Sequence, residues 1–95
     1  MTLEQRYKLQ EYLSFLIYDI GNIPADVEVR IKFLTTTATT FDDIKKLYHI
    51  LPQDDIETVE TIQVCFINLT GDLSENKSDI EKASELISKL ITKYN

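Results

Sequence analysis

The stretch 34-LTTTATTFDD-43 decides how this chain folds, because it follows an apolar segment and permits three interpretations. Five of the six residues from 35 to 40 are threonines, which fit a β-strand, an extended linker or the boundary between two helices. β-branched side chains lose rotamer freedom in a helix, so the run lowers helix propensity. Thr40 followed by Asp43 then forms a typical N-terminal helix cap. We therefore predict a boundary between two helices here.

Two periodicities compete in the preceding segment, residues 26–37. Alternate residues from Val27 to Phe33 are apolar, which is the pattern of a strand with one buried face. A helical stripe runs through the same segment and consists of Ile23, Val27, Ile31, Leu34 and Ala38. Acid–base pairs four residues apart support the helix, because a helix brings such residues together: Asp26–Arg30 and Glu28–Lys32. We favour the helix and keep an α+β fold of order αβαβα, with strands near 26–37 and 60–70, as the alternative.

Capping residues divide the rest of the chain into further helices. Thr2 with Gln5, and Ser78 with Glu81, form capping boxes that mark the starts of the first and last helices. Further boundaries are indicated by Pro24 and by Asp54 or Asp55 at helix starts, and by Gly21, Pro52 and Gly71 at helix ends. With so few glycines and prolines, the elements between these boundaries should be long and regular.

Each expected helix has an apolar stripe that would face a common core. The stripes are Leu3, Leu13, Leu16, Ile17 and Ile20; Phe41, Ile44, Leu47, Tyr48 and Leu51; Ile56, Val59, Ile62, Phe66 and Leu69; and Ile80, Ala83, Leu86, Ile87, Leu90, Ile91 and Tyr94. Short connections make neighbouring helices antiparallel. The sequence therefore predicts an all-α fold, a compact antiparallel bundle of four to five helices, as a single helical domain over residues 1–95.

Composition limits the kinds of partner. Acidic residues outnumber basic ones 16 to 10, for a net charge of −6. Because nucleic-acid binding depends on Lys and Arg, we expect no direct contact with DNA or RNA. No stretch approaches the length of about 20 apolar residues that a membrane span needs, and the charged N-terminal residues do not form a signal peptide. We expect a cytoplasmic protein, and the many Ile, Lys and Asn residues suggest an AT-rich genome such as that of a low-GC bacterium or its phage.

Residues that carry catalysis or bind metals are scarce. Cys65 and His49 are the only cysteine and histidine, too few for a structural zinc site. Cys65 lies among apolar residues of an expected helix, where a thiol acts as a small hydrophobe, and His49 lies opposite an apolar stripe. The chain contains only two glycines and lacks every glycine-rich phosphate-binding motif. We expect no enzymatic activity, no bound metal and no cofactor.

The first helix also carries aromatic residues outside its core-facing stripe: Tyr7, Tyr12, Phe15 and Tyr18. A helix that is apolar all round is usually buried on every side, so one explanation is that this helix lies at the centre of the bundle. The other is that the aromatic residues form an interface, because Tyr and Phe are enriched at interface cores. They would then contact a protein partner or a second copy of the chain.

Acidic residues are concentrated in one part of the chain. Residues 42–81 contain ten acids and three lysines. Their net charge of −7 is larger than the −6 of the whole chain. Most of these acids fall at expected helix starts, where the helix dipole favours them. They also form an acidic segment that could steer a basic partner, with Asp54, Asp55, Glu57 and Glu60 as the expected contact residues.

In size, acidity and helical make-up, the chain resembles small bacterial immunity proteins and phage-encoded inhibitors. This resemblance implies a small non-catalytic module that binds and sequesters another protein, one with a basic surface. The alternative is a helical homo-oligomer with a structural role or with a small ligand held between subunits.

Overall fold

The computed structural model describes residues 1–71 and 73–95. Within these residues lie four long helices, α1 (Leu3–Gly21), α2 (Val27–Lys45), α3 (Gln53–Ile67) and α4 (Lys77–Lys93), and two short 3-10 helices, η1 (Tyr48–Ile50) and η2 (Asn68–Thr70). No strand occurs in the described part of the chain. The predicted all-α bundle is confirmed, and the αβαβα alternative is wrong because both proposed strand segments are helical.

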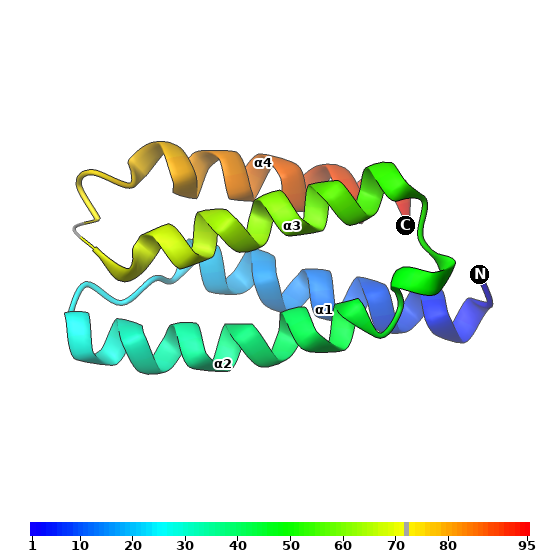
Figure 1. Cartoon of the computed structure of the whole chain (residues 1–95), viewed down its shortest axis with the longest axis horizontal. Coiled ribbons are helices and arrows are strands. Elements are labelled where there is room, and N and C mark those ends of the chain that lie inside the picture. Colours follow the sequence, from blue (N-terminus) through cyan, green and yellow to red (C-terminus); the bar gives the residue numbers. More distant parts are fainter. Residues whose placement is uncertain (72) are drawn as a thin grey trace.

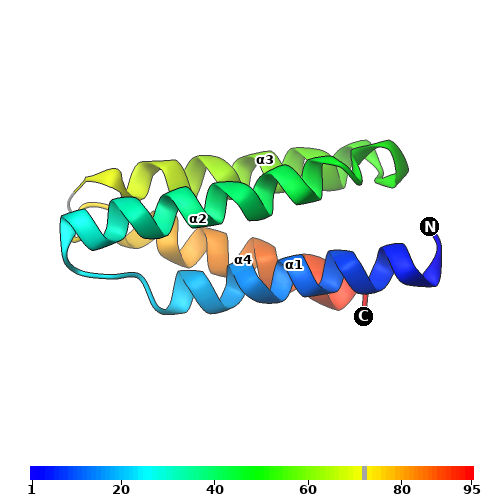
Figure 2. The ribbon, with the colours of Figure 1, turned by 90° about the horizontal axis from the view of Figure 1, so that it is seen from below.

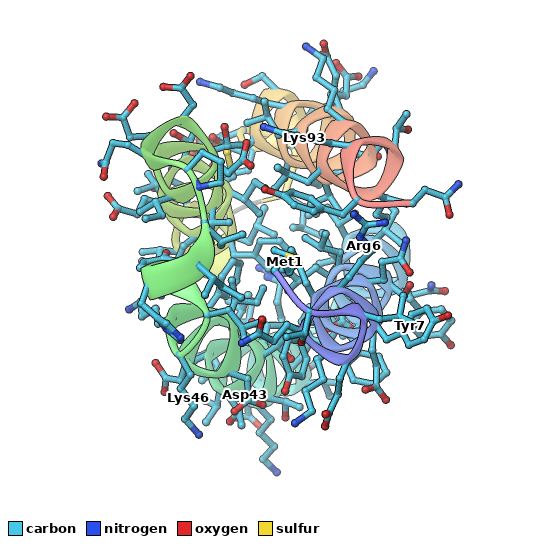
Figure 3. The ribbon with its side chains drawn as sticks, turned by 90° about the vertical axis from the view of Figure 1, so that its right-hand side faces the viewer. Met1, Arg6, Tyr7, Asp43, Lys46 and Lys93 are labelled. Carbon is cyan, nitrogen blue, oxygen red and sulfur yellow. The ribbon has the colours of Figure 1, made fainter. Side chains whose placement is uncertain are left out.

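The four long helices run alternately up and down and form an antiparallel bundle (Figure 1). Viewed end-on, they lie at the corners of a square, so that α1 neighbours α2 and α4 while α3 neighbours α4 and α2 (Figure 3). The α1–α2 and α3–α4 connections lie at one end of the bundle, and both termini lie at the other (Figures 1 and 2). Contacts are dense where α4 meets α1 and α3, and sparse where α2 meets α3. The α2–α3 seam is therefore the loosest part of the bundle.

The interior is filled by apolar side chains from all four long helices and the segments between them. They are Leu9, Leu13, Leu16, Ile20, Phe41, Ile44, Leu47, Leu51, Val59, Ile62, Cys65, Phe66, Leu69, Ala83, Ile87, Leu90 and Tyr94. The rings of Phe41 and Phe66 meet edge to face, with centroids 5.3 Å apart and planes at 75°. This aromatic pair links α2 to α3, and such a pair adds about 0.5–1.5 kcal/mol beyond the area that it buries.

The first helix begins as its capping box predicts. The Thr2 side chain accepts a hydrogen bond from the Gln5 amide, and the Gln5 side chain accepts one from the Thr2 amide. Leu3, however, is 62% exposed, so its predicted place in the core is wrong. The first turn of α1 has no neighbouring helix to cover that side, and burial begins at Leu9.

The threonine stretch lies inside α2, so the predicted helix–helix boundary is wrong. The helix runs without interruption from Val27 to Lys45. The hydroxyls of Thr35 and Thr36 donate to backbone carbonyls one turn earlier, at Ile31 and Lys32. Threonines that bond in this way remain compatible with a helix, and packing of the residues that follow them overrides their low propensity.

The two halves of α2 point their apolar residues in different directions. The buried residues of this helix are Arg30, Thr37, Phe41 and Ile44. The predicted stripe, which includes Val27, Ile31, Leu34 and Ala38, is centred about 80° away around the helix at about 100° per residue. A straight helix cannot turn both sets toward the core, and the set that contains the two large C-terminal residues is the one inside. Val27 and Ile31 are 53% and 52% exposed, so their predicted burial is wrong, whereas Ile23 and Leu34 of the same stripe pack against the core.

Residues 41–51 do not form a separate helix, because the first five of them complete α2 and η1 follows. Their predicted stripe is nevertheless inside: Leu47 and Leu51 are buried and Tyr48 packs against the core. The starts of the last two helices also differ from the predicted caps. Pro52 precedes the first residue of α3, and Asn76 precedes the first residue of α4, without a side-chain cap in either case.

Arg30 is buried at the end of the bundle where the α1–α2 and α3–α4 connections lie. It is 2% exposed, and it does not form the ion pair with Asp26 that the sequence predicts. Asp26 instead caps α2 by accepting from the Val29 amide. The guanidinium donates to the backbone carbonyls of Pro24 and Ala25, and to those of Leu69 and Gly71. One side chain thus ties the start of α2 to the end of α3.

A second buried polar cluster joins α3 to α4 near the other end. Asp55 is 5% exposed, and its carboxylate accepts hydrogen bonds from the Tyr94 hydroxyl and from Lys93, whose Nζ lies 2.9 Å away. Burial, and then the hydrogen bond to Asp55, raises the pKa of the Tyr94 hydroxyl. Asp55 therefore fixes the first turn of α3 against the last turn of α4.

None of the helices in the described residues is long and apolar enough to cross a membrane.

Candidate functional site

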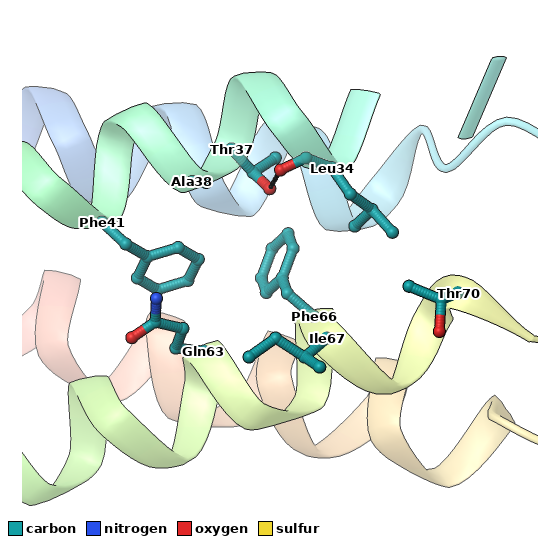
Figure 4. A pocket seen from close by; sticks show the side chains of 8 residues that line it. All are labelled: Leu34, Thr37, Ala38, Phe41, Gln63, Phe66, Ile67 and Thr70. Atoms are coloured by element: carbon teal, nitrogen blue, oxygen red, sulfur yellow. Dashed lines mark hydrogen bonds between the residues drawn. The ribbon is translucent and has the colours of Figure 1, made fainter. Parts of the chain in front are cut away.

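An apolar groove lies along the loose seam between α2 and α3 (Figure 4). It is lined by Leu34, Thr37, Ala38 and Phe41 from α2, by Gln63, Phe66 and Ile67 from α3, and by Thr70 from η2. The volume is about 120 Å³. An apolar cavity of about 150 Å³ accommodates benzene, so this groove is large enough for one bulky aliphatic side chain.

Exposed apolar side chains border this groove on both helices. On α2, Val27 and Ile31 continue the row that leads through Leu34 to Ala38. On α3, Ile67 lines the groove and is 59% exposed, and Val64, one turn earlier and 54% exposed, lies on the solvent side of the helix. Isolated apolar side chains on a surface are ordinary, but a row on each side of an open apolar groove is typical of a binding surface. We refer to the groove and these two rows as the α2/α3 face.

Acidic residues continue the α3 row toward the start of that helix. Glu57, Glu60, Val64 and Ile67 follow one another at intervals of three or four residues, so they share one face of α3. Both glutamates are exposed. At the facing end of α2, Asp42 and Lys45 carry opposite charges, so Glu57 and Glu60 make this end acidic. The α2/α3 face is therefore apolar over part of its length and acidic at one end.

The aromatic residues of α1 lie on a different side of the molecule. Tyr7, Phe15 and Tyr18 are 61%, 48% and 68% exposed, and Tyr7 points away from the other helices (Figure 3). Tyr12 is partly buried and packs against the core. The explanation that α1 is a central helix covered on all sides is wrong, because α1 occupies a corner of the bundle.

The predicted contact residues do not form one surface. α1 and α3 lie diagonally across the bundle, so the aromatic side of α1 and the acidic side of α3 face different directions (Figure 3). Asp54, Glu57 and Glu60 are exposed, whereas Asp55 is buried and bonded within the chain. Asp55 therefore joins α3 to α4 through Lys93 and Tyr94 and is not part of the exposed acidic surface. Asp72, one of the ten acids of residues 42–81, lies outside the described residues.

Cys65 and His49 are the two side chains that the sequence singled out for possible chemistry. Cys65 is buried, and burial is the main cause that raises the pKa of its thiol, which keeps it in the unreactive protonated form. His49 is exposed in η1. In the described part of the chain, no group of three or more His, Cys, Asp or Glu residues is arranged to hold a metal ion.

Compared with models of protein families, with curated proteins and with solved structures, the chain has no significant match.

The sequence did not indicate the groove itself, because its two walls come from segments about thirty residues apart. One signal was nevertheless present. The apolar stripe of residues 23–38 and that of residues 41–51 point in different directions if one helix carries both. In a continuous helix, such a shift leaves one stripe outside the core.

Proposed function

We propose that this protein is a small non-catalytic module that binds an amphipathic helix of a partner protein on the α2/α3 face. The observation that carries the proposal is the uncovered apolar row of α2 beside an open apolar groove. A helix laid into a groove between two helices is a common mode of peptide recognition, in which apolar residues on one side of the ligand serve as anchors. A single Leu, Ile or Met would fill the groove, while its neighbours would cover Ile31 and Ile67.

Charge favours a basic partner. The bound helix would extend from the apolar part of the face over Glu57 and Glu60, where lysines or arginines would be attracted. The net charge of −6 adds a general attraction for basic proteins and raises the rate of encounter. A module of this kind would act by sequestering its partner, as an inhibitor or immunity-type protein does.

A pair of designed peptides tests this proposal. Each is an amphipathic helix of about 18 residues, long enough at about 1.5 Å per residue to span the row from Val27 to Ala38. Both have a leucine and alanine side, and the polar side carries lysines in one peptide and glutamates in the other. Fluorescence anisotropy should show binding of the lysine peptide and at least about tenfold weaker binding of the glutamate peptide, a difference of about 1.4 kcal/mol.

Matched variants locate the binding. Ile31→Glu and Ile67→Glu each place a charge on the α2/α3 face and should abolish binding. Val29→Glu is the control, because Val29 is also exposed on α2, at 54%, but lies on the side of the helix toward α1. Failure of both peptides to bind, or equal loss with Val29→Glu, would refute a helix-binding groove at this place.

The same variants test whether a second copy of the chain covers the face instead. Light scattering should give a mass near the 11.0 kDa of one chain. A dimer that Ile31→Glu separates into monomers would overturn the proposal and assign the face to self-association.

A further inference from the structure

A second groove lies on the other side of α2, along its seam with α1. Phe15, Tyr18 and Asp19 line it from α1, and Thr39, Thr40 and Asp43 are among the residues that line it from α2. Its volume is about 540 Å³, several times that of the apolar groove. This groove brings together two of the predicted aromatic contact residues and the threonine stretch, which are about twenty residues apart in the sequence.

The groove is negatively charged. Two acidic residues line it, Asp19 on the α1 wall and Asp43 on the α2 wall, and no lysine or arginine is among the lining residues. Asp19 is partly buried, and this burial raises the pKa of its carboxyl group. Asp43 has an exposed partner, Lys46, whose Nζ lies 3.4 Å from Oδ1 at the outer edge of α2 (Figure 3). An exposed pair of this kind is worth little and can exchange partners.

The remaining lining groups suit a flat cation. Phe15 and Tyr18 present exposed rings, and a guanidinium stacks on an aromatic face while it donates to a carboxylate. The hydroxyls of Thr39 and Thr40 can accept hydrogen bonds from the same group. A lysine ammonium lacks the planar shape that stacks on a ring while it donates to a carboxylate.

We infer that the groove between α1 and α2 binds an arginine side chain of the partner protein, stacked on Phe15 or Tyr18 and paired with Asp19 or Asp43. The inference rests on the proposed function, because the arginine is assigned to the protein whose helix lies on the α2/α3 face. Both sites border α2, so a partner lying across this helix reaches both. The arginine contact gives the aromatic residues of α1 a function that the α2/α3 face alone does not.

The test uses arginine with its charged ends removed, as the Nα-acetyl amide, and the corresponding derivative of citrulline as a neutral control of almost the same shape. Nuclear magnetic resonance of the whole chain follows the methyl groups of Thr39 and Thr40 and the ring of Phe15. The arginine derivative should produce saturable shifts at these positions and at least about fivefold tighter binding than citrulline, the ratio expected for about 1 kcal/mol of charge pairing.

Variants distinguish a specific arginine site in this groove from a general attraction of cations to an acidic protein. Asp19→Asn combined with Asp43→Asn should weaken arginine binding by about fivefold or more, whereas Glu81→Gln, an exposed acid on α4, should leave it unchanged. Tyr18→Leu keeps an apolar side chain without a ring and should weaken binding by about twofold to fivefold. Equal shifts with citrulline, or equal effects of the Asp and Glu81 variants, would overturn the inference.

The two proposals fail separately. Ile67→Glu blocks the α2/α3 face from α3, which lies diagonally across the bundle from α1, and should not affect the arginine shifts. A positive arginine result with no peptide binding would leave the second groove without the proposed partner, and the opposite result would remove only the arginine site.

Discussion

Replacement of Arg30 by methionine tests how the bundle is held together at the end where α2 begins. Methionine keeps much of the length and volume of the side chain but removes every donor. Four backbone carbonyls lose their partner: those of Pro24, Ala25, Leu69 and Gly71. The substitution therefore affects hydrogen bonding far more than packing.

The cost follows from where those carbonyls lie. Leu69 is fully buried, so its carbonyl, now 2.7 Å from the Arg30 Nε, would stay without water, at about 1–3 kcal/mol. Ala25 and Gly71 are exposed, and their carbonyls can bind water instead, so each lost bond there costs about 0.5–1.5 kcal/mol. Methionine also removes the desolvation cost of the buried guanidinium charge, and this gain offsets part of the loss. We expect a net loss of about 3–4 kcal/mol, a large share of the stability of about 5–15 kcal/mol of a small protein.

Urea unfolding followed by circular dichroism at the helix band measures this loss. Arg30→Lys is the matched control, because the ammonium keeps the charge and some donors but cannot reach carbonyls on both sides at once. We expect Arg30→Lys to lose about half as much as Arg30→Met. A loss below about 1 kcal/mol for Arg30→Met would refute the role of Arg30 as an anchor between the two connections.

Three further results are expected. Ile44→Ala should cost about 2–5 kcal/mol of stability, because Ile44 is fully buried. Ile31→Ala should cost less than about 1 kcal/mol, because Ile31 is 52% exposed. Equal losses in urea unfolding would contradict the assignment of the two α2 stripes. Tyr94→Phe removes a hydrogen bond to buried Asp55 and should cost about 1–3 kcal/mol, seen as a lower thermal midpoint, and an unchanged midpoint would show that this bond contributes nothing. Because the pKa of Tyr94 is raised in the folded state, its contribution is constant below the ordinary tyrosine value of about 10 and is lost as the pH rises above it. Unfolding measured from neutral to alkaline pH should show this fall, and Tyr94→Phe should make it smaller.

Local signals in the sequence were enough to predict the fold class and much of the core. The capping box at Thr2 and the stripe from Ala83 to Tyr94 depend only on nearby residues, and both match the structure. The predictions failed where distant residues decide the outcome. The threonines lower helix propensity in isolation, but Phe41 packs on Phe66 and the helix continues through them.

The candidate site was predictable only in part, for the same reason. The sequence placed Phe15 and Tyr18 outside the core-facing stripe of α1, but it left open whether they would be buried in a central helix or exposed, as they are in the structure. Burial of Asp55 could not be foreseen, because its partners Lys93 and Tyr94 are almost forty residues away. The predicted acidic and aromatic residues also could not be assigned to separate sides until the diagonal arrangement of α1 and α3 was known.

Arg30 also fixes the rotation of α2 about its own axis. Its guanidinium reaches the carbonyls of Leu69 and Gly71 only when that side of the helix faces α3 and the interior. If α2 rolled by about 80°, the row from Val27 to Ala38 would turn inward and Arg30 would lose these acceptors. A charged residue in the interior therefore keeps an apolar row at the surface. The hydrogen bonds that keep the α2/α3 face uncovered therefore lie beside one end of the groove, on either side of its lining residue Thr70.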